Sequence, residues 1–241
     1  MPKSEPKTQK VRFHDLGLIS YAEAWDFQEK LFHALVSRKT TLRGTEAEKD
    51  APVHELIFCS HPPVFTLGKS ANEQNLLFPE AIIRQAGAEV FKINRGGDIT
   101  FHGPGQLVAY PIFDLDHFFT DIHRYLRTLE EAIIMTLAEF GIQAGRYPGY
   151  TGVWLDPERE DKARKICAMG VRCSRWVTMH GLAFNLNTDL EWFNKIVPCG
   201  ISDKKVSSLH LELGHAVDEN HVKAILLEKM AGLFDFIWEK A

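Results

Sequence analysis

The chain has 241 residues, of which 45% are hydrophobic and 25% are charged, and this is enough for one large domain or two small ones. Its formal net charge of −4 provides no basic field of the kind that nucleic-acid binding requires. No apolar run reaches the roughly 18 residues that a membrane span needs, and the polar start MPKSEPKTQK lacks the apolar centre of a signal peptide. These features predict a soluble, cytoplasmic protein that binds neither nucleic acid nor membrane.

In chain order, residues 1–12 are expected to form a disordered polar tail, and residues 13–241 a single domain. Ser20 and Glu23 form a capping box ahead of apolar residues at helical spacing, which predicts a helix over 20–38. A polar loop follows over 38–52, and a charged loop is expected over 156–164. Further helices are predicted at 78–87, 121–141 and about 219–239.

Apolar segments bounded by turn residues predict strands at 53–60, 61–68, 88–95, 107–115, 141–147, 151–156, 165–173 and 176–187. Pro111 indicates an edge strand or a bulge at its position. Because the strands come in adjacent runs that hairpins can join, we expect an α+β fold. It would be a single domain with a mixed, largely antiparallel sheet flanked by helices.

The stretch RGGDITFHGPGQ at 95–106 combines turn residues with polar side chains. Gly96 and Gly97 lack Cβ atoms, so their backbone can adopt positive φ and approach a ligand closely. The same glycines would also serve an ordinary β-hairpin, and turn chemistry alone does not decide between the two. The stretch matches neither a dinucleotide-binding fingerprint nor a phosphate-binding P-loop.

Four cysteines are present, and only Cys199 lies in a turn, within VPCGI. Cys59, Cys167 and Cys173 lie on or at the end of predicted strands, where cysteine usually packs as a small apolar residue. A reactive thiol needs a partner that favours the thiolate. The candidates are His102, His180 and Lys165, and spacing alone does not choose among them.

Four segments in this order, RGGDITFHGPGQLVAY, KICAMGVR, WVTMHGLAFNLN and PCGI, resemble the lipoyl(octanoyl) transferase family, which transfers octanoyl groups from acyl carrier protein to proteins. HPPVFTLGKSANEQNLL is also similar to the family's segment before the first motif, and the likeness runs from about residue 13 to about residue 213. The resemblance implies a fold similar to the catalytic domain of biotin and lipoate protein ligases. The tail and the loops over 38–52 and 156–164 depart from the family pattern.

By this resemblance, Cys199 is the nucleophile that accepts the acyl group, and Lys165 lowers its pKa and carries protons. The implied substrate-binding residues fall in three short segments: Arg95, Gly96, Gly97, Asp98, Ile99, Thr100, Phe101 and His102; Ala168, Met169 and Gly170; and Gly181, Leu182 and Ala183. Backbone N–H groups near Gly170 or His180–Gly181 would stabilise the oxyanion. No metal and no cofactor are implied.

The implied donor is octanoyl-acyl carrier protein. The implied acceptors are lysines of lipoyl domains in the E2 subunits of 2-oxoacid dehydrogenases and of the glycine cleavage H protein. An ATP-dependent lipoate ligase on the same fold, an acyl-carrier-protein thioesterase and a non-catalytic acyl-binding protein are the alternatives. Each makes a different use of ATP, water or a reactive thiol. Oligomeric state and chain-length preference do not follow from the sequence.

Overall fold

The computed structural model describes residues 8–197 and 205–241, and the side chains of Glu48 and Lys49 are also left out of the description. Within these ranges the main sheet has the order β10-β8-β9-β6-β2-β1-β11, and β7 also pairs with β8. A smaller sheet has the order β4-β3-β5. The strands are β1 (Gln9–Leu18), β2 (Val53–Ser60), β3 (Val64–Leu67), β4 (Glu89–Lys92), β5 (Ile99–His102), β6 (Gln106–Ile112), β7 (Val153–Leu155), β8 (Arg164–Ser174), β9 (Val177–Asn185), β10 (Lys205–Val206) and β11 (Phe236–Lys240).

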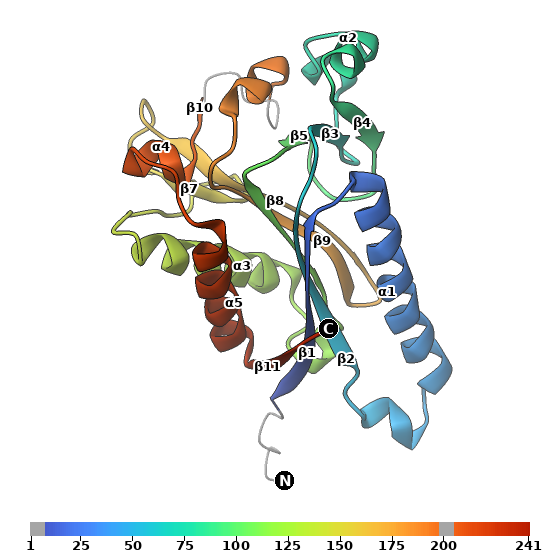
Figure 1. Cartoon of the computed structure of the whole chain (residues 1–241). Coiled ribbons are helices and arrows are strands. Elements are labelled where there is room, and N and C mark those ends of the chain that lie inside the picture. Colours follow the sequence, from blue (N-terminus) through green and yellow to red (C-terminus); the bar gives the residue numbers. More distant parts are fainter. Residues whose placement is uncertain (1–7, 198–204) are drawn as a thin grey trace.

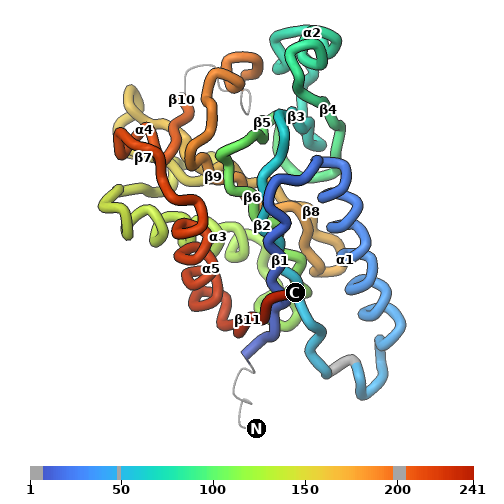
Figure 2. Tube along the Cα trace, in the orientation of Figure 1, coloured from blue at the N-terminus to red at the C-terminus, as the bar shows by residue number. Residues whose placement is uncertain are grey.

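The helices lie on both faces of the main sheet, α1 on one face and α3 and α5 on the other (Figure 1). The α-helices are α1 (Tyr21–Leu42), α2 (Glu80–Gln85), α3 (Ile122–Ala138), α4 (Leu209–Leu213) and α5 (Glu219–Phe234). Short 3₁₀ turns are η1 (Glu46–Lys49), η2 (Glu73–Asn75), η3 (Leu115–His117) and η4 (Leu190–Lys195). In Figure 2, α2 and the small sheet form the upper end of the molecule, beyond the start of α1.

The predicted α+β architecture with a mixed sheet is confirmed. The central strands β2, β6, β9 and β8 are antiparallel neighbours. Parallel pairs lie toward the edges, where β1 pairs with β2 and β11, and β10 pairs with β8. Two apolar cores result, one between the sheet and α3 with α5, and one between the sheet and α1.

The start of α1 is built as the sequence predicts. The Ser20 Oγ accepts a hydrogen bond from the Glu23 backbone N–H, and its hydroxyl donates to the Glu23 carboxylate at 2.6 Å. Phe32 and Leu35 point from the helix into the core. Helix α3 likewise begins at a capping residue, since Asp121 accepts from two backbone N–H groups. Local capping chemistry therefore predicts the starts of these two helices correctly. The end of α1 was predicted wrongly, since the helix continues to Leu42 and takes up the first part of the loop expected over 38–52.

Both ends of the chain differ from the prediction. Strand β1 begins at Gln9, so residues 9–12 are not part of a disordered tail but pair with β2 and β11. The last helix ends at Phe234 rather than near 239, because Asp235 adopts a left-handed conformation with φ +55°. The residues after Asp235 form β11 beside β1. The two terminal strands lie side by side at the lower end of Figure 1.

Two strand predictions need correction as well. Residues 141–147 form no strand and make only a single bridge, between Gly145 and Trp154. Pro111 lies on β6 at the centre of the sheet, between β2 and β9, so it is not on an edge. The alternative of a bulge is not borne out either: the β6–β9 ladder stops at Ala109 opposite Leu182 and resumes in the same register at the Asp114–Val177 bridge, so no extra residue is inserted.

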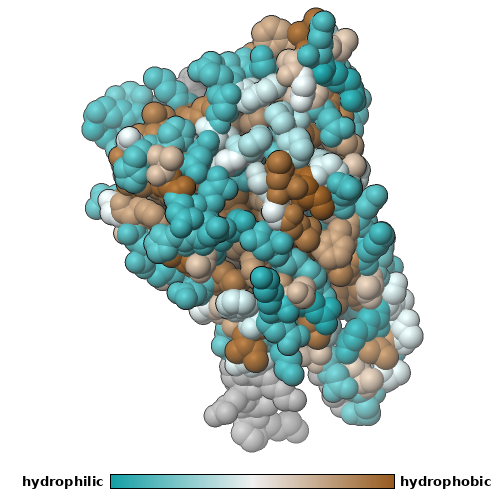
Figure 3. Space-filling view, viewed as in Figure 1, coloured by the Kyte–Doolittle hydropathy of each residue, from teal (hydrophilic) through white to brown (hydrophobic). Residues whose placement is uncertain are grey.

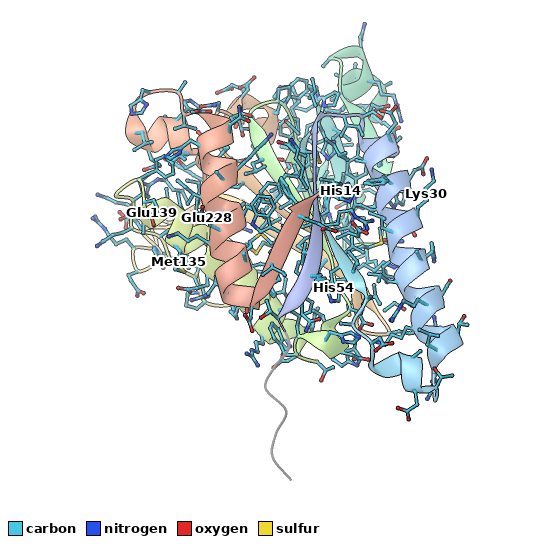
Figure 4. All side chains as sticks on the ribbon, turned by 60° about the horizontal axis from the view of Figure 1, so that its bottom comes forward. His14, Lys30, His54, Met135, Glu139 and Glu228 are labelled. Atoms are coloured by element: carbon cyan, nitrogen blue, oxygen red, sulfur yellow. The ribbon has the colours of Figure 1, made fainter. Side chains whose placement is uncertain are left out.

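The surface in Figure 3 is largely hydrophilic, with separate small apolar patches. Seen from below in Figure 4, His14 on β1 and His54 on β2 lie between the helical layers, while Lys30 projects outward from α1. The labelled side chains Met135, Glu139 and Glu228 lie on the side of α3 and α5. No helix among the described residues is long and apolar enough to cross a membrane.

Candidate active site

A pocket opens where the small sheet meets the middle of the main sheet. Its walls come from β5 and the loop before it, from β6, from β8 and from β9. The residues that line it are Tyr21, Arg95, Gly97, Asp98, Ile99, Thr100, His102, Val108, Tyr110, Lys165, Ala168, Met169, Gly170, His180, Gly181, Leu182 and Ala183. The structure thus brings the three predicted substrate-binding segments together around Lys165.

Two predicted residues do not line this pocket. Phe101 points away from it, and its ring stacks on Trp192 with the centroids 5.4 Å apart and the planes 6° apart. Phe101 belongs instead to the apolar cluster of the small sheet, with Phe65 and Phe193. Gly96 instead joins two segments, because its N–H donates to the Val171 carbonyl on β8 at 2.9 Å.

Gly170 and Gly181 allow two backbone segments to pack in direct contact. A Cβ on Gly170 would lie 2.8 Å from the Gly96 carbonyl oxygen, and one on Gly181 would lie 2.1 Å from the Ala109 carbonyl oxygen. Gly97 in addition has φ +90°, a conformation that glycine adopts without steric cost. The glycines of the stretch at 95–106 can therefore serve both a turn and a binding site, because they shape the turn and pack it against β8.

A chain of hydrogen bonds fixes the ring of His102. Arg95 donates from Nη2 to both the carbonyl oxygen (2.7 Å) and Oγ1 (3.0 Å) of Thr66, and this Oγ1 lies 3.5 Å from His102 Nε2. Gln106 donates from Nε2 to Asn185 Oδ1 at 2.8 Å, so its Oε1 accepts from His102 Nδ1 at 2.8 Å. With Nδ1 as the donor, the proton of the neutral imidazole is on Nδ1.

The pKa values of both histidines in the pocket exclude them as effective bases for a thiol. Burial lowers the pKa of His102 to about 3, and the neighbouring His61 and Arg95 add to the effect. Burial also lowers the pKa of His180 to about 3, with contributions from Arg95 and Arg172. A thiol has a pKa near 8.5, so an imidazole with a pKa near 3 is too weak a base to take the proton of the thiol. His102 is an anchored wall of the pocket.

His180 has an unusual environment. Its backbone N–H donates to Gln28 Oε1 at 3.0 Å, and its Nε2 lies 3.1 Å from Asn94 Oδ1. Its Nδ1 is buried and has no hydrogen-bond partner within the described part of the chain. A buried residue other than glycine at positive φ carries backbone strain, which often marks a functional position.

Sequence reasoning did not find the aromatic residues of the pocket. Tyr21 stacks on His102 with the ring centroids 6.0 Å apart and the planes 10° apart. The Tyr110 hydroxyl lies 2.8 Å from His61 Nε2, while His61 Nδ1 donates to the Ile19 carbonyl. Both tyrosines sit in ordinary apolar contexts, so nothing in the sequence distinguished them from core residues.

Lys165 is the second residue of β8 and lies where this strand pairs with both β7 and β10. Its register partners are Trp154 on β7 and Val206 on β10, and its Nζ lies 4.8 Å from the centroid of the Trp154 ring. Ser207 donates its backbone N–H to the Lys165 carbonyl at 2.9 Å. Cys199 lies outside the described residues, so the predicted pairing of Cys199 with Lys165 stays a prediction.

The other cysteines divide into two groups. Cys59 and Cys167 are buried, and burial raises the pKa of each thiol far above its ordinary value, which keeps it protonated. Their interpretation as packing residues fits this environment. Cys173 is exposed, so its prediction as a packed side chain was wrong. No group of three or more His, Cys, Asp or Glu side chains within residues 8–197 and 205–241 is arranged to hold a metal ion.

The family model of the lipoyl protein ligase A/B catalytic domain matches residues 20–231 of the chain. The fold resembles a bipartite lipoate protein ligase from Thermoplasma acidophilum, with a TM-score of 0.69 and 16% identity over 97% of this chain and 88% of that one. At this identity the likeness concerns the fold alone.

Two relatives of similar length identify the family more closely than the fold does. An octanoyltransferase of Cytophaga hutchinsonii is 57% identical over 228 residues, which cover 94% of this chain and 93% of the relative. An octanoyltransferase of Flavobacterium johnsoniae is 52% identical over 229 residues, which cover 94% of this chain and 97% of the relative. The chain belongs to the octanoyltransferase family.

Proposed function

We propose that the protein moves an octanoyl group from octanoyl-acyl carrier protein to the ε-amine of a lysine on a lipoyl domain, through a thioester on Cys199. The Cys199 thiolate attacks the donor's thioester carbonyl, the donor's C–S bond breaks, and the pantetheine thiolate takes a proton from Lys165. The acceptor amine then attacks the new thioester, a C–N bond forms, and Lys165 accepts the amine's proton as the Cys199 thiolate leaves. The protons balance over the two half-reactions.

The position of Lys165 is the observation that supports this proposal most directly. Lys165 lies in the wall of the pocket that also collects the three predicted binding segments. The other two candidates, His102 and His180, are neutral and weakly basic because they are buried beside Arg95. An ammonium group favours a neighbouring thiolate, whereas these imidazoles do not.

The anchors of the segment that carries Cys199 also support the proposal. Before it, the Val197 backbone N–H donates to the Asn75 carbonyl at 2.8 Å. After it, Lys205 and Val206 form β10, which pairs directly with Arg164 and Lys165 on β8. Cys199 is therefore separated by few residues from a strand that lies against the proposed proton carrier.

Apolar side chains in the pocket suit a medium-length alkyl chain. Val108, Met169, Leu182 and Ala183 contribute to the wall on the side of β6, β8 and β9. Each buried CH₂ group stabilises binding by about 0.8 kcal/mol, so burial of an eight-carbon chain against these residues can contribute substantially to affinity. The lipoyl domains of 2-oxoacid dehydrogenases and of the glycine cleavage H protein are the proposed acceptors, with the cytoplasm as the proposed place of reaction.

The decisive experiment exposes the protein to octanoyl-acyl carrier protein without ATP and maps the added mass by proteolysis and mass spectrometry. We expect one octanoyl group on Cys199, lost in Cys199→Ser and retained in the matched variants Cys167→Ala and Cys173→Ser. Adding a lipoyl domain should move the label to its lysine. A strict need for ATP would favour a ligase, release of free octanoate despite the acceptor would favour a thioesterase, and an absent adduct would refute the covalent route.

A further inference from the structure

Trp154 is packed against Lys165 on the strand opposite it. The two residues are register partners in the β7–β8 pair, so their side chains lie on the same face of the sheet. The Lys165 Nζ lies over the Trp154 ring at 4.8 Å from its centroid, within the range of cation–π contacts. Trp154 is only 1% exposed, which removes water from this face of the ammonium group.

The ring itself is held from several sides. Tyr147 and Tyr150 pack against it with centroid distances of 5.1 and 6.0 Å. The Trp154 backbone exchanges two hydrogen bonds with Gly145, at 2.8 and 2.9 Å. A three-residue strand would not be rigid on its own, so these contacts explain how β7 keeps the ring in one orientation.

The start of β7 is fixed by a buried carboxylate. Glu130 on α3 accepts from the Gly152 backbone N–H at 3.0 Å and from Arg146 at 2.9 Å, and its side chain is fully buried. Gly152 lies close to β8, because a Cβ there would be 2.5 Å from the Cys167 carbonyl oxygen. The start of β7, the strand that carries Trp154, is therefore held by a hydrogen bond to α3 on one side and by close packing against β8 on the other.

We propose that Trp154 is a positioning residue of the acyl-transfer reaction, which holds the ammonium group of Lys165, the proposed proton carrier, in one orientation in the pocket wall. This inference rests on the proposed function. The negative face of the indole ring attracts the cation and limits the rotamers of a long, flexible side chain. Trp154 acts through its contact with Lys165.

The test measures the rate of alkylation of Cys199 by iodoacetamide as a function of pH, with the label mapped by mass spectrometry. The wild type should show an apparent thiol pKa below 8.5. We expect Trp154→Leu to raise it, so that the thiolate fraction at neutral pH falls by about two- to tenfold, and Trp154→Phe to lie between the two because a smaller ring binds a cation less strongly. Both half-reactions should slow in the same order.

Leu155→Ala is the matched control, since Leu155 is a buried neighbour on β7 whose side chain points to the opposite face. It should lower the melting temperature while leaving the pH profile of alkylation unchanged. If Trp154→Leu does not fold, the comparison of Trp154→Phe with Leu155→Ala decides whether Trp154 positions Lys165. An unchanged profile in the folded Trp154 variants overturns the positioning role, whereas a wild-type thiol that takes no octanoyl group and titrates near 8.5 refutes the proposed function itself.

Discussion

Replacement of Gly170 by alanine tests how the loop of residues 95–97 is held against β8. The new Cβ would lie 2.8 Å from the Gly96 carbonyl oxygen and 3.0 Å from Arg95 Cδ. Both distances are about 0.5 to 1 Å shorter than an ordinary non-bonded contact. Gly170 has no positive φ, so the effect is one of contact and not of backbone strain. The 95–97 loop has to move away from the strand.

The size of the effect follows from what holds the loop. The Gly96 N–H bonds to Val171 at 2.9 Å, and Arg95 donates two bonds to Thr66. Weakening one or two of these costs about 1–3 kcal/mol. Replacing glycine within a strand recovers about 0.5–1 kcal/mol of backbone entropy. We therefore expect Gly170→Ala to lower the free energy of unfolding by about 1–2 kcal/mol.

The effect on activity should exceed the effect on stability. Arg95, Gly97 and Asp98 line the pocket, so a displaced loop changes the site while the cores stay intact. We expect kcat/KM for octanoyl-acyl carrier protein to fall at least tenfold, a change of about 1.4 kcal/mol in transition-state stabilisation. Urea denaturation gives the stability, and initial rates of acyl transfer give the activity.

The matched control is the same substitution at Gly232 in α5, where an added Cβ meets no atom within 4 Å. Because alanine is the better helix former, Gly232→Ala should stabilise the protein by about 0.5–1 kcal/mol and leave activity unchanged. If Gly170→Ala matched the wild type in stability and in kcat/KM, the close approach of the loop to β8 would not be what shapes the pocket.

Four buried histidines make stability depend on pH, because their folded pKa values are about 3 to 4 and lie below the unfolded value near 6.5: His54, His61, His102 and His180. The unfolded chain binds more protons than the folded one between these values, so stability falls as pH falls from about 6.5 toward 4, by up to about 5 kcal/mol per pH unit. His54→Asn should reduce that slope by about 1.4 kcal/mol per unit in denaturation series at several pH values, and an unchanged slope would contradict burial as the cause. Ser20→Ala removes the cap of α1 and should cost about 1 kcal/mol in urea denaturation, with no loss if the cap is replaced by water. Asp235→Gly relieves the exposed left-handed residue after α5 and should raise the free energy of unfolding by about 0.5–1 kcal/mol, whereas a decrease would mean that the aspartate side chain stabilises this turn.

The sequence predicted the elements whose determinants are local. Ser20 and Asp121 cap α1 and α3 with side chains that lie next to the backbone they bond. Strand β11 was missed because its apolar residues continue the helical spacing of α5, and the helix ends at an aspartate instead of the glycine that usually signals such an end. Strand β1 was missed in part because its first residues share the polar composition of the tail, while its stability comes from β2 and β11.

The candidate site was predictable only as separate segments. The sequence pointed to residues 95–102, 168–170 and 181–183, and the structure places most of them around one pocket with Lys165. It could not show that Tyr21 would stack on His102, because 81 positions of chain separate them and only the folded sheets bring them together. Trp154 gave no signal as the neighbour of the lysine, because the register of the β7–β8 pair, which is irregular between Val153 and Trp154, sets which residue lies opposite Lys165.

The electrostatics of the pocket connect its neutral histidines with its chemistry. Arg95 and Lys165 are two cations in the pocket wall, and the Arg95 charge contributes to the low pKa of both His102 and His180. A positive field that opposes protonation of an imidazole favours deprotonation of a thiol. The histidines therefore need not act as acids or bases for the site to generate a nucleophile. As the pH falls through the range below 6.5, acyl transfer should be limited by the thiolate fraction, because neither pocket histidine titrates until about pH 3. An activity profile that followed an ionisation near 6.5 and lost it in His180→Asn would contradict this assignment.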